Sequence, residues 1–274
     1  MIKSFSTLVW SLFLSCSAAN ATVCTQVTDE VNQKVIEVCD TSKNTFNNSF
    51  SKAKKYLERE VYNDELLSRN TLYCGCTYSE KKIVDNSSCW FEHNKKYIKR
   101  SKKIEWEHVV PAQAFGKSFE AWTLGDRDCV NSKWKKFKGR KCASKVEKEY
   151  QFMESDMYNL FPAIGSINAL RSNYAFEIIE WEDREFWECD MEIGNKRAEP
   201  TESIRGDIAR IYFYMEISYP WRLVISDVRM KILEAWSLQD PVSEEECERY
   251  KAIKKIQKNE NVILMKECKN NELK

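Results

Sequence analysis

The chain of 274 residues has only two histidines, and one of them, His108, directly follows a carboxylate, Glu107. A glutamate oxygen is a hard ligand of the kind that Mg²⁺ and Ca²⁺ prefer. A neutral imidazole can take a proton from water near neutral pH. Residues 105–112, which read Glu-Trp-Glu-His-Val-Val-Pro-Ala, therefore hold the two parts of a metal-assisted hydrolytic site. The other histidine, His93, lies in a charged segment, where we expect it to be solvated.

A β-strand is expected to carry this pair, because apolar residues recur at Ile104, Trp106 and Val110. Neighbouring side chains of a regular strand point to opposite faces, so Glu107 and His108 can serve one site only where the strand bends or ends. Pro111 favours such an end, since proline cannot donate to the hydrogen bonds of a sheet. The alternative is that the histidine is a core residue and the glutamate a surface charge.

A second run, residues 156–174, combines several asparagines with the apolar residues of buried structure. Apolar residues at helical spacing predict a helix here that extends toward Ile178 and Trp181, from Ile164, Ile167, Leu170 and Tyr174. The same spacing predicts helices over residues 208–219 and 230–236, and hints at a short one over residues 31–39. Residues 71–73 and 83–84 look like strands, and residues 126–145 look like a loop.

Together the two runs resemble the bacterial endonuclease I family, whose members are periplasmic or secreted non-specific nucleases with a ββα-metal site. Several segments follow the order of the family's motifs: residues 73–76, 104–112, 159–165, Asn168, 171–173 and 205–210. The resemblance covers residues from about 60 to about 270. It implies an α+β fold, a single mixed domain that contains a ββα-metal motif and is stabilised by disulfides.

The resemblance also implies a set of site residues. His108 would be the general base, while Glu107 and Asn168 would hold one Mg²⁺, with Ca²⁺ or Mn²⁺ as alternatives. Arg140 matches the family position that contacts the scissile phosphate, and its planar fork suits two phosphate oxygens. The alternative for the asparagines is that they only cap helices and form turns.

Two basic runs, residues 95–103 and 133–145, flank the Glu-His motif in the sequence. The net charge of the chain does not indicate a nucleic-acid partner, since 43 Lys and Arg are balanced by 42 Asp and Glu. The two basic runs are therefore either solvated faces or local phosphate-binding surfaces. The candidate nucleic-acid contacts are Arg140, Lys138, Lys141, Arg171, Lys102 and Lys103. Phosphate contacts carry no sequence information, so cleavage is expected to be non-specific and sensitive to salt.

The sequence departs from the family pattern at two places near the second run. Tyr158 stands where a histidine is common, and Ala169 and Leu170 replace a Gly-Asp pair. Neither belongs to the set of base, metal ligands and phosphate-binding arginine, so we expect activity to survive. Glu154 and Asp156 are weaker candidates, as partners of the site residues.

The N-terminus is typical of a secretory signal, residues 1–21, with a basic start, an apolar stretch over residues 5–14 and an Ala-Asn-Ala cleavage pattern. The stretch is too short to span a bilayer as a mature helix. We expect an N-terminal extension over residues 22–60 and a nuclease domain over residues 61–274. A periplasmic or secreted monomer without a membrane span is expected.

The chain has 11 cysteines, and removal of the signal takes away Cys16 and leaves an even set. In an oxidising compartment an even set favours disulfides, here among Cys24, Cys39, Cys74, Cys76, Cys89, Cys129, Cys142, Cys189, Cys247 and Cys268. Cys24–Cys39, Cys129–Cys142 and Cys247–Cys268 are the simplest pairs. A zinc site at Cys74 and Cys76 is the alternative, but no second Cys pair or His pair follows at zinc spacing.

The sequence thus predicts an exported, Mg²⁺-dependent endonuclease that hydrolyses DNA, with RNA as a second substrate, to products that carry 5′-phosphates. Two alternatives remain. The first is a catalytically inactive nucleic-acid-binding protein on the same fold. The second is an exported phosphoesterase that acts on small molecules. Cleavage within a long plasmid separates the endonuclease from both.

Overall fold

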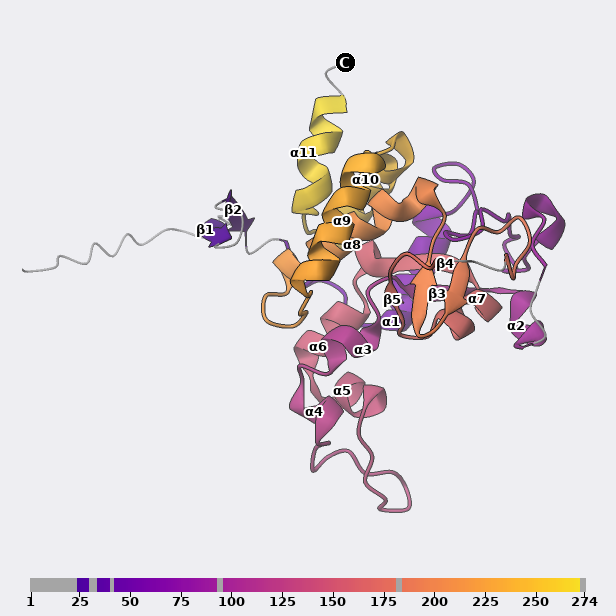
Figure 1. Ribbon diagram of the computed structural model, residues 1–274. Helices are drawn as coiled ribbons and strands as arrows, with labels where there is room; N and C mark the ends of the chain where they lie inside the picture. The colour runs from indigo at the N-terminus through magenta and orange to yellow at the C-terminus, as the bar shows by residue number, and fades with distance from the viewer. Residues whose placement is uncertain (1–23, 30–33, 40–41, 93–95, 181–183, 272–274) are drawn as a thin grey trace, which may run out of the picture. The chain divides into compact units, whose positions relative to one another are not determined.

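The computed structural model describes residues 24–29, 34–39, 42–92, 96–180 and 184–271 (Figure 1). The expected signal peptide lies outside these residues. By its contacts the chain divides into two compact units, residues 1–40 and 41–274. Among the described residues, no helix has the length and apolar character that crossing a bilayer requires.

The first unit contains an antiparallel hairpin of β1 (Cys24–Asp29) and β2 (Lys34–Cys39). The expectation of a short helix over residues 31–39 was therefore wrong. The β-branched residues Val35, Ile36 and Val38 suit a strand, and in a hairpin they outweigh a helical spacing of only a few residues. The register places Cys24 opposite Cys39, and their disulfide stays a prediction.

The second unit begins ahead of the boundary that we expected near residue 61. Its first helix, α1 (Phe50–Tyr56), continues into a π-helical turn, η1 (Leu57–Val61). The side chain of Ser49 caps α1 by accepting a hydrogen bond from the amide of Lys52. Ala53, Leu57 and Val61 are fully buried in the main core. Residues 42–60 therefore pack as part of the large unit.

At the centre of this unit, β3 (Ile104–His108) pairs with β4 (Leu160–Ile164) in an antiparallel register from Ile104↔Ile164 to His108↔Leu160. The helix α7 (Gly165–Arg171) follows β4 directly. Glycine is required at the junction, because a Cβ on Gly165 would lie 2.6 Å from the carbonyl oxygen of Arg100. Two strands and a helix are thus joined at the place that the Glu-His and Asn-rich motifs occupy.

The expected helix after β4 is shorter than its apolar spacing suggested. α7 ends at Arg171, because Ser172 takes a positive φ of 53°, which is outside the helical region. Ala175–Phe176 then forms β5, which pairs with β7 (Arg197–Glu199), and β7 also pairs with β6 (Glu192–Gly194). The predicted continuation to Ile178 was wrong, and Trp181 lies outside the described residues.

Helices surround the two-stranded core. The C-terminal ones are α8 (Arg205–Ser218), α9 (Asp227–Gln239), α10 (Glu244–Gln257) and α11 (Val262–Asn271). The shorter ones are α2 (Ile98–Ser101), α3 (Ala112–Gly116), α4 (Glu120–Thr123), α5 (Arg140–Val146) and α6 (Lys148–Glu154). Single 3₁₀ turns are η2 (Asn86–Cys89), η3 (Met157–Asn159) and η4 (Glu202–Ile204). The mixed α+β class and the helices expected near α8 and α9 are confirmed.

Two local expectations were wrong. Residues 71–73 form a turn instead of a strand, and residues 83–84 make only isolated bridges. The loop expected over residues 126–145 ends early, because α5 begins at Arg140. In both places a disulfide-bonded cysteine lies inside the segment or beside it, and such cross-links constrain the chain independently of its local spacing.

Four disulfides join the described cysteines of the large unit: Cys74–Cys189, Cys76–Cys89, Cys129–Cys142 and Cys247–Cys268. The last two confirm the pairs expected from sequence. Cys74 and Cys76 both lie in disulfides, so neither can be a zinc ligand. The structure therefore supports the expectation of a disulfide-stabilised fold.

Candidate active site

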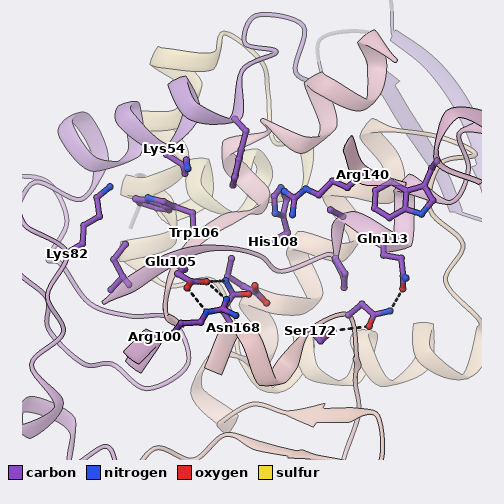
Figure 2. A pocket seen from close by; sticks show the side chains of 17 residues that line it. Lys54, Lys82, Arg100, Glu105, Trp106, His108, Gln113, Arg140, Asn168 and Ser172 are labelled. Carbon is purple, nitrogen blue, oxygen red and sulfur yellow. Dashed lines mark hydrogen bonds and ion pairs between the residues drawn. The ribbon is translucent and has the colours of Figure 1, made fainter. Parts of the chain in front are cut away.

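A cavity of about 650 Å³ lies where β3 ends, and it is lined by residues of α1, β3, α3, α5 and α7 (Figure 2). It includes all four residues expected to form the catalytic centre: Glu107, His108, Arg140 and Asn168. β3 ends at His108, so the strand ends where we expected it to, and the adjacent side chains of Glu107 and His108 can share one site. The tertiary structure therefore brings together residues that are up to 61 positions apart, from Glu107 to Asn168.

Asn159 closes the exit of β3. Its side-chain oxygen accepts from the amide of Val110 at 2.7 Å, and its amide nitrogen donates to the carbonyl of Val110 at 3.0 Å. The side chain thus continues the pattern of the ladder after the strand has ended. Asn159 therefore has a structural role, which was the alternative that we gave for the asparagines. Its side chain is buried away from solvent.

His108 is 6% exposed and stacks on the ring of Phe50, with ring centroids 5.1 Å apart. Its Nε2 lies 2.9 Å from the backbone carbonyl oxygen of Glu154. A carbonyl oxygen can only accept, so Nε2 carries the proton and Nδ1 is the basic nitrogen. Burial, with a further contribution from the charge of Arg140, lowers the pKa of His108 to about 3, so the imidazole is neutral at neutral pH.

Glu107 is 3% exposed and forms a buried ion pair with Arg171, whose Nη1 lies 2.6 Å from Oε1. The hydroxyl of Tyr73 donates to the same oxygen at 3.2 Å. Burial raises the pKa of Glu107, and the positive charge of Arg171 opposes that rise. Among the described residues, Oε2 is the oxygen of this carboxylate that accepts no hydrogen bond from the protein.

Arg171 does not have the role that the sequence suggested. Its side chain is 0% exposed, so the guanidinium cannot reach a phosphate. Instead it binds Glu107 and donates to the backbone carbonyls of His108 at 2.8 Å and Val109 at 2.5 Å. The expected nucleic-acid contact at Arg171 is therefore corrected to an internal support of the end of β3, because the guanidinium is buried and its two terminal nitrogens bind Glu107 and the backbone.

Asn168 lies on α7, and its Nδ2 donates to Oε2 of Glu105 at 3.0 Å. The bond uses the amide nitrogen and leaves Oδ1 as the acceptor that could bind a cation. Glu105 also forms a two-point ion pair with Arg100, from Nε to Oε1 at 2.7 Å and from Nη2 to Oε2 at 2.5 Å (Figure 2). Sequence reasoning gave Glu105 no role, although residues 105 and 107 share one face of a strand and could have pointed to it.

Arg140 is the first residue of α5, and its half-exposed side chain lies over the ring of Phe50. Its Nε donates to Oε1 of Glu154 at 2.6 Å. Among the described residues Arg140 makes this bond through Nε only, so both terminal nitrogens of the guanidinium can bind a ligand in the cavity. Glu154, a weaker candidate from sequence, thus contacts both Arg140 and His108.

Other polar residues of the cavity were not foreseen. Lys54 lies over the Phe50 ring at 4.6 Å, and Lys82 forms an ion pair with Glu58 at 2.5 Å. Gln113 of α3 accepts a hydrogen bond from the amide of Asn173. All come from segments far from the Glu-His motif or beyond its end, and nothing in their local sequence marks them.

The four lysines expected to bind nucleic acid, Lys102, Lys103, Lys138 and Lys141, are exposed and lie outside the lining of the cavity. Tyr158 is buried and its hydroxyl donates to the carbonyls of Tyr250 and Asn259. Neither Tyr158 nor Leu170 lines the cavity, so both departures from the family pattern fall outside it.

The donors of the cavity fit one hard cation. Glu107 offers a carboxylate oxygen and Asn168 an amide oxygen, and both line the same cavity. Within the described residues no group of three or more His, Cys, Asp or Glu side chains could hold a metal ion. An ion at Glu107 and Asn168 would thus keep most of its positions for water and phosphate, as Mg²⁺ commonly does.

The chain is similar to known proteins over most of its length. The sequence model of the endonuclease I family matches residues 43–266. The chain is 38% identical over 226 residues to an extracellular deoxyribonuclease of Aeromonas hydrophila, which covers 80% of this chain and 90% of that one. The chain belongs to the endonuclease I family. Its similarity to further members is of the same order.

A periplasmic deoxyribonuclease of Aeromonas hydrophila is 39% identical over 205 residues, or 73% of this chain and 79% of that one. An endonuclease-1 of Buchnera aphidicola subsp. Acyrthosiphon pisum is 38% identical over 203 residues, or 72% and 74%. The names of two of these relatives give a location, extracellular in one and periplasmic in the other. They confirm the expected location of this endonuclease I protein outside the cytoplasm. The match also begins at residue 43, close to the start of the large unit.

Proposed function

We propose that this endonuclease I protein is an exported, divalent-metal-dependent endonuclease that hydrolyses phosphodiester bonds within DNA, with RNA as a second substrate. The observation that carries the proposal is the convergence of His108, Glu107, Asn168 and Arg140 on one cavity. The names of the relatives support DNA as the substrate. β3, β4 and α7 have the order of a ββα-metal motif, and we assign them to it.

In the proposed reaction each residue of the site has a separate role. Nδ1 of His108 takes a proton from the attacking water, and the carbonyl of Glu154 steadies the ring through Nε2–H as charge develops on it. The terminal nitrogens of Arg140 hold the non-bridging oxygens of the scissile phosphate. The stack on Phe50 fixes the plane of the imidazole. The expected products carry 5′-phosphates.

Glu107 and Asn168 would hold the cation, which we propose to be Mg²⁺, with Ca²⁺ or Mn²⁺ as alternatives. When bound, the cation supplies positive charge against the phosphate and the leaving oxygen. Arg171 keeps the carboxylate of Glu107 in place through the bond to Oε1. Glu105 holds the amide of Asn168 through the bond to Nδ2.

The proposal is tested by incubating the oxidised mature protein with supercoiled plasmid, with Mg²⁺ and with EDTA. Nicking and fragmentation in Mg²⁺ alone are expected, and His108→Ala should abolish both while the circular dichroism spectrum stays that of the wild type. No cleavage by a folded wild type in Mg²⁺, Mn²⁺ or Ca²⁺ would overturn the proposal in favour of a nucleic-acid-binding protein. Release of phosphate from small esters with an intact plasmid would favour a small-molecule phosphoesterase.

A further inference from the structure

Residues 124–139 join α4 to α5 and extend away from the body around β3 and β4 (Figure 1). Part of this segment is a small hairpin. Val130 bridges Lys136 in antiparallel fashion, and the amide of Phe137 donates to the carbonyl of Cys129 at 2.9 Å. We name residues 129–137 the tryptophan hairpin, after the residue near its tip. None of its residues lines the active-site cavity.

The tryptophan hairpin has its own folded base. Cys129 and Cys142 are both 0% exposed and form a disulfide that links the hairpin to α5. Together with Ala121 they make an apolar cluster separate from the main core, against which Phe137 and Val146 pack. A cross-linked base of this kind lowers the entropy of the segment, so the tip is presented in a defined conformation.

The tip of the hairpin exposes a large aromatic ring among lysines. Trp134 is 85% exposed, and its neighbours Lys133, Lys135 and Lys136 are exposed too. The side chain of Asn131 fixes the turn, because its Oδ1 accepts from the amides of Lys133 at 2.9 Å and Lys135 at 3.0 Å. The exposed indole leaves its ring face accessible to a ligand, and the cations around it favour a ligand that carries negative charge.

The backbone at Trp134 has an unusual conformation for a bulky residue. Its φ is 57°, in the left-handed region that bulky residues rarely adopt, where Asn or Gly would be at ease. A tryptophan therefore occupies a position that favours other residues on two counts, exposure and backbone conformation. Trp221 shares both features, so it is the lysines on both sides that distinguish Trp134 from it.

We propose that the tryptophan hairpin is a second contact with the nucleic-acid substrate, in which Trp134 stacks on or wedges between bases while Lys133, Lys135 and Lys136 bind the flanking phosphates. The inference rests on the proposed function for the identity of the ligand. Aromatic rings that stack on bases, combined with cations that follow the backbone, are the means by which proteins bind nucleic acid without sequence preference.

The position of the hairpin fits one continuous substrate. Trp134 precedes Arg140 by six residues, so the two lie within about 20 Å even if the chain between them is fully extended. At about 3.4 Å per nucleotide step, this is about six steps along a duplex. Lys138 and Lys141 are exposed on either side of Arg140 in the sequence and add positive charge to this segment.

The small apolar area of the tip favours nucleic acid over a lipid surface as the partner. The acidic residues of the segment, Asp126 and Asp128, flank the base of the hairpin, where Lys145 donates to the carbonyl of Asp128 at 2.5 Å. The tip itself offers one aromatic ring and three cations. A single ring offers little apolar area to a bilayer, whereas it is a complete platform for one base.

The test measures binding in EDTA, where no cleavage occurs, by fluorescence anisotropy of a labelled 20-base-pair duplex. Trp134→Ala should raise the Kd by about 5-fold to 150-fold, as the loss of one stacked base predicts. Trp134→Phe should restore most of the affinity, while Trp134→Leu, which is apolar without a comparable π-face, should not. Trp221→Ala is the matched control, because Trp221 is 92% exposed, also has a positive φ and stands outside the basic run.

The lysines are tested through the salt dependence of the same binding. Each phosphate contact contributes about 0.9 to the slope of log K against log salt for duplex DNA. The triple variant Lys133→Gln, Lys135→Gln, Lys136→Gln should therefore lower the magnitude of the slope by about 2 to 3. Trp134→Ala should leave the slope close to that of the wild type, since a stacked ring displaces no counterion.

The outcomes separate this inference from the proposed function. Wild-type Kd and slope in all hairpin variants would overturn the second contact, whether or not the wild type cleaves plasmid. A wild type that binds duplex through the hairpin but cuts nothing would leave the second contact standing and remove the proposed function. Sedimentation of the wild type with anionic vesicles, lost in Trp134→Ala while duplex binding is kept, would overturn it in favour of a lipid surface.

Discussion

The backbone carbonyl of Glu154 accepts a hydrogen bond from Nε2 of His108 at 2.9 Å, and this contact fixes both the tautomer and the orientation of the imidazole. The carboxylate of Glu154 meanwhile binds Arg140 and the hydroxyl of Ser144 at 2.8 Å. One residue at the end of α6 therefore positions the proposed base with its main chain and the proposed phosphate ligand with its side chain. The two functions can be separated by mutation.

Glu154→Gln should impair Arg140 and spare His108. The substitution keeps the backbone carbonyl, but it replaces the charged acceptor of Arg140 with a neutral one, which weakens a charge-assisted hydrogen bond by about 1 kcal/mol. We expect KM for plasmid DNA to rise and the pH profile of cleavage to keep its shape. Steady-state kinetics check this, with Arg140→Ala as the reference for complete loss of the phosphate contact. A shifted pH profile with an unchanged KM would contradict the assignment.

Arg171→Met should destabilise the fold strongly. It leaves the buried carboxylate of Glu107 without its ion pair, and removal of one partner of a buried pair typically costs about 3–5 kcal/mol. Urea unfolding measures this loss of stability. The loss should be much smaller in the double variant Glu107→Gln, Arg171→Met. If Arg171 were instead a phosphate contact, the single variant would unfold as the wild type does and lose only DNA binding.

Asn168→Ala should raise the concentration of Mg²⁺ that gives half-maximal cleavage by about 10-fold or more, because loss of a direct ligand weakens a site at least as much as loss of an outer partner. Binding of duplex in EDTA should not change. Glu105→Gln is the companion variant, since it keeps an oxygen that can accept from Nδ2 of Asn168 and so should give a smaller shift. Titration of the cleavage rate with Mg²⁺ provides both values, and a wild-type titration for Asn168→Ala would exclude it as a ligand.

Asp207→Asn should make the stability of the protein less sensitive to pH. Burial, and then the neighbouring Glu246, raise the pKa of Asp207 well above its ordinary value of 3.8. The folded protein thus holds a proton that the unfolded chain releases, so stability falls as the pH rises above about 3.8 toward the raised pKa. Asparagine mimics the protonated acid and can still accept the hydrogen bond of Arg210.

Thermal melts from pH 4 to pH 8 test this, because the Tm of the Asp207→Asn variant minus that of the wild type should become more positive as the pH rises. Asp227→Asn is the control, since Asp227 lies in the first turn of α9 as Asp207 does in that of α8, but is exposed. A difference in Tm that is constant across the pH range would contradict the raised pKa.

The sequence by itself predicted which residues would share the candidate site. Glu107 and His108 are adjacent, so their strand and its end before Pro111 could be predicted from a period of two and one proline. The resemblance of the motifs predicted that Asn168 and Arg140 join them. Two of the four disulfides of the structure, Cys129–Cys142 and Cys247–Cys268, were expected because their cysteines are close in sequence. These features are local, or depend on residue types that few other sites require.

Only the tertiary structure decided which charges are available to a ligand. Nothing in the sequence distinguishes Arg171 from other arginines, but in the fold its guanidinium forms an ion pair with Glu107, 64 residues away in the sequence. Glu105 and Phe50 gained their places in the site through contacts with Asn168 and His108, which no local pattern encodes. Burial and pairing arise from long-range packing, and the same basic or acidic side chain is a solvated charge or a structural support according to what the fold places against it.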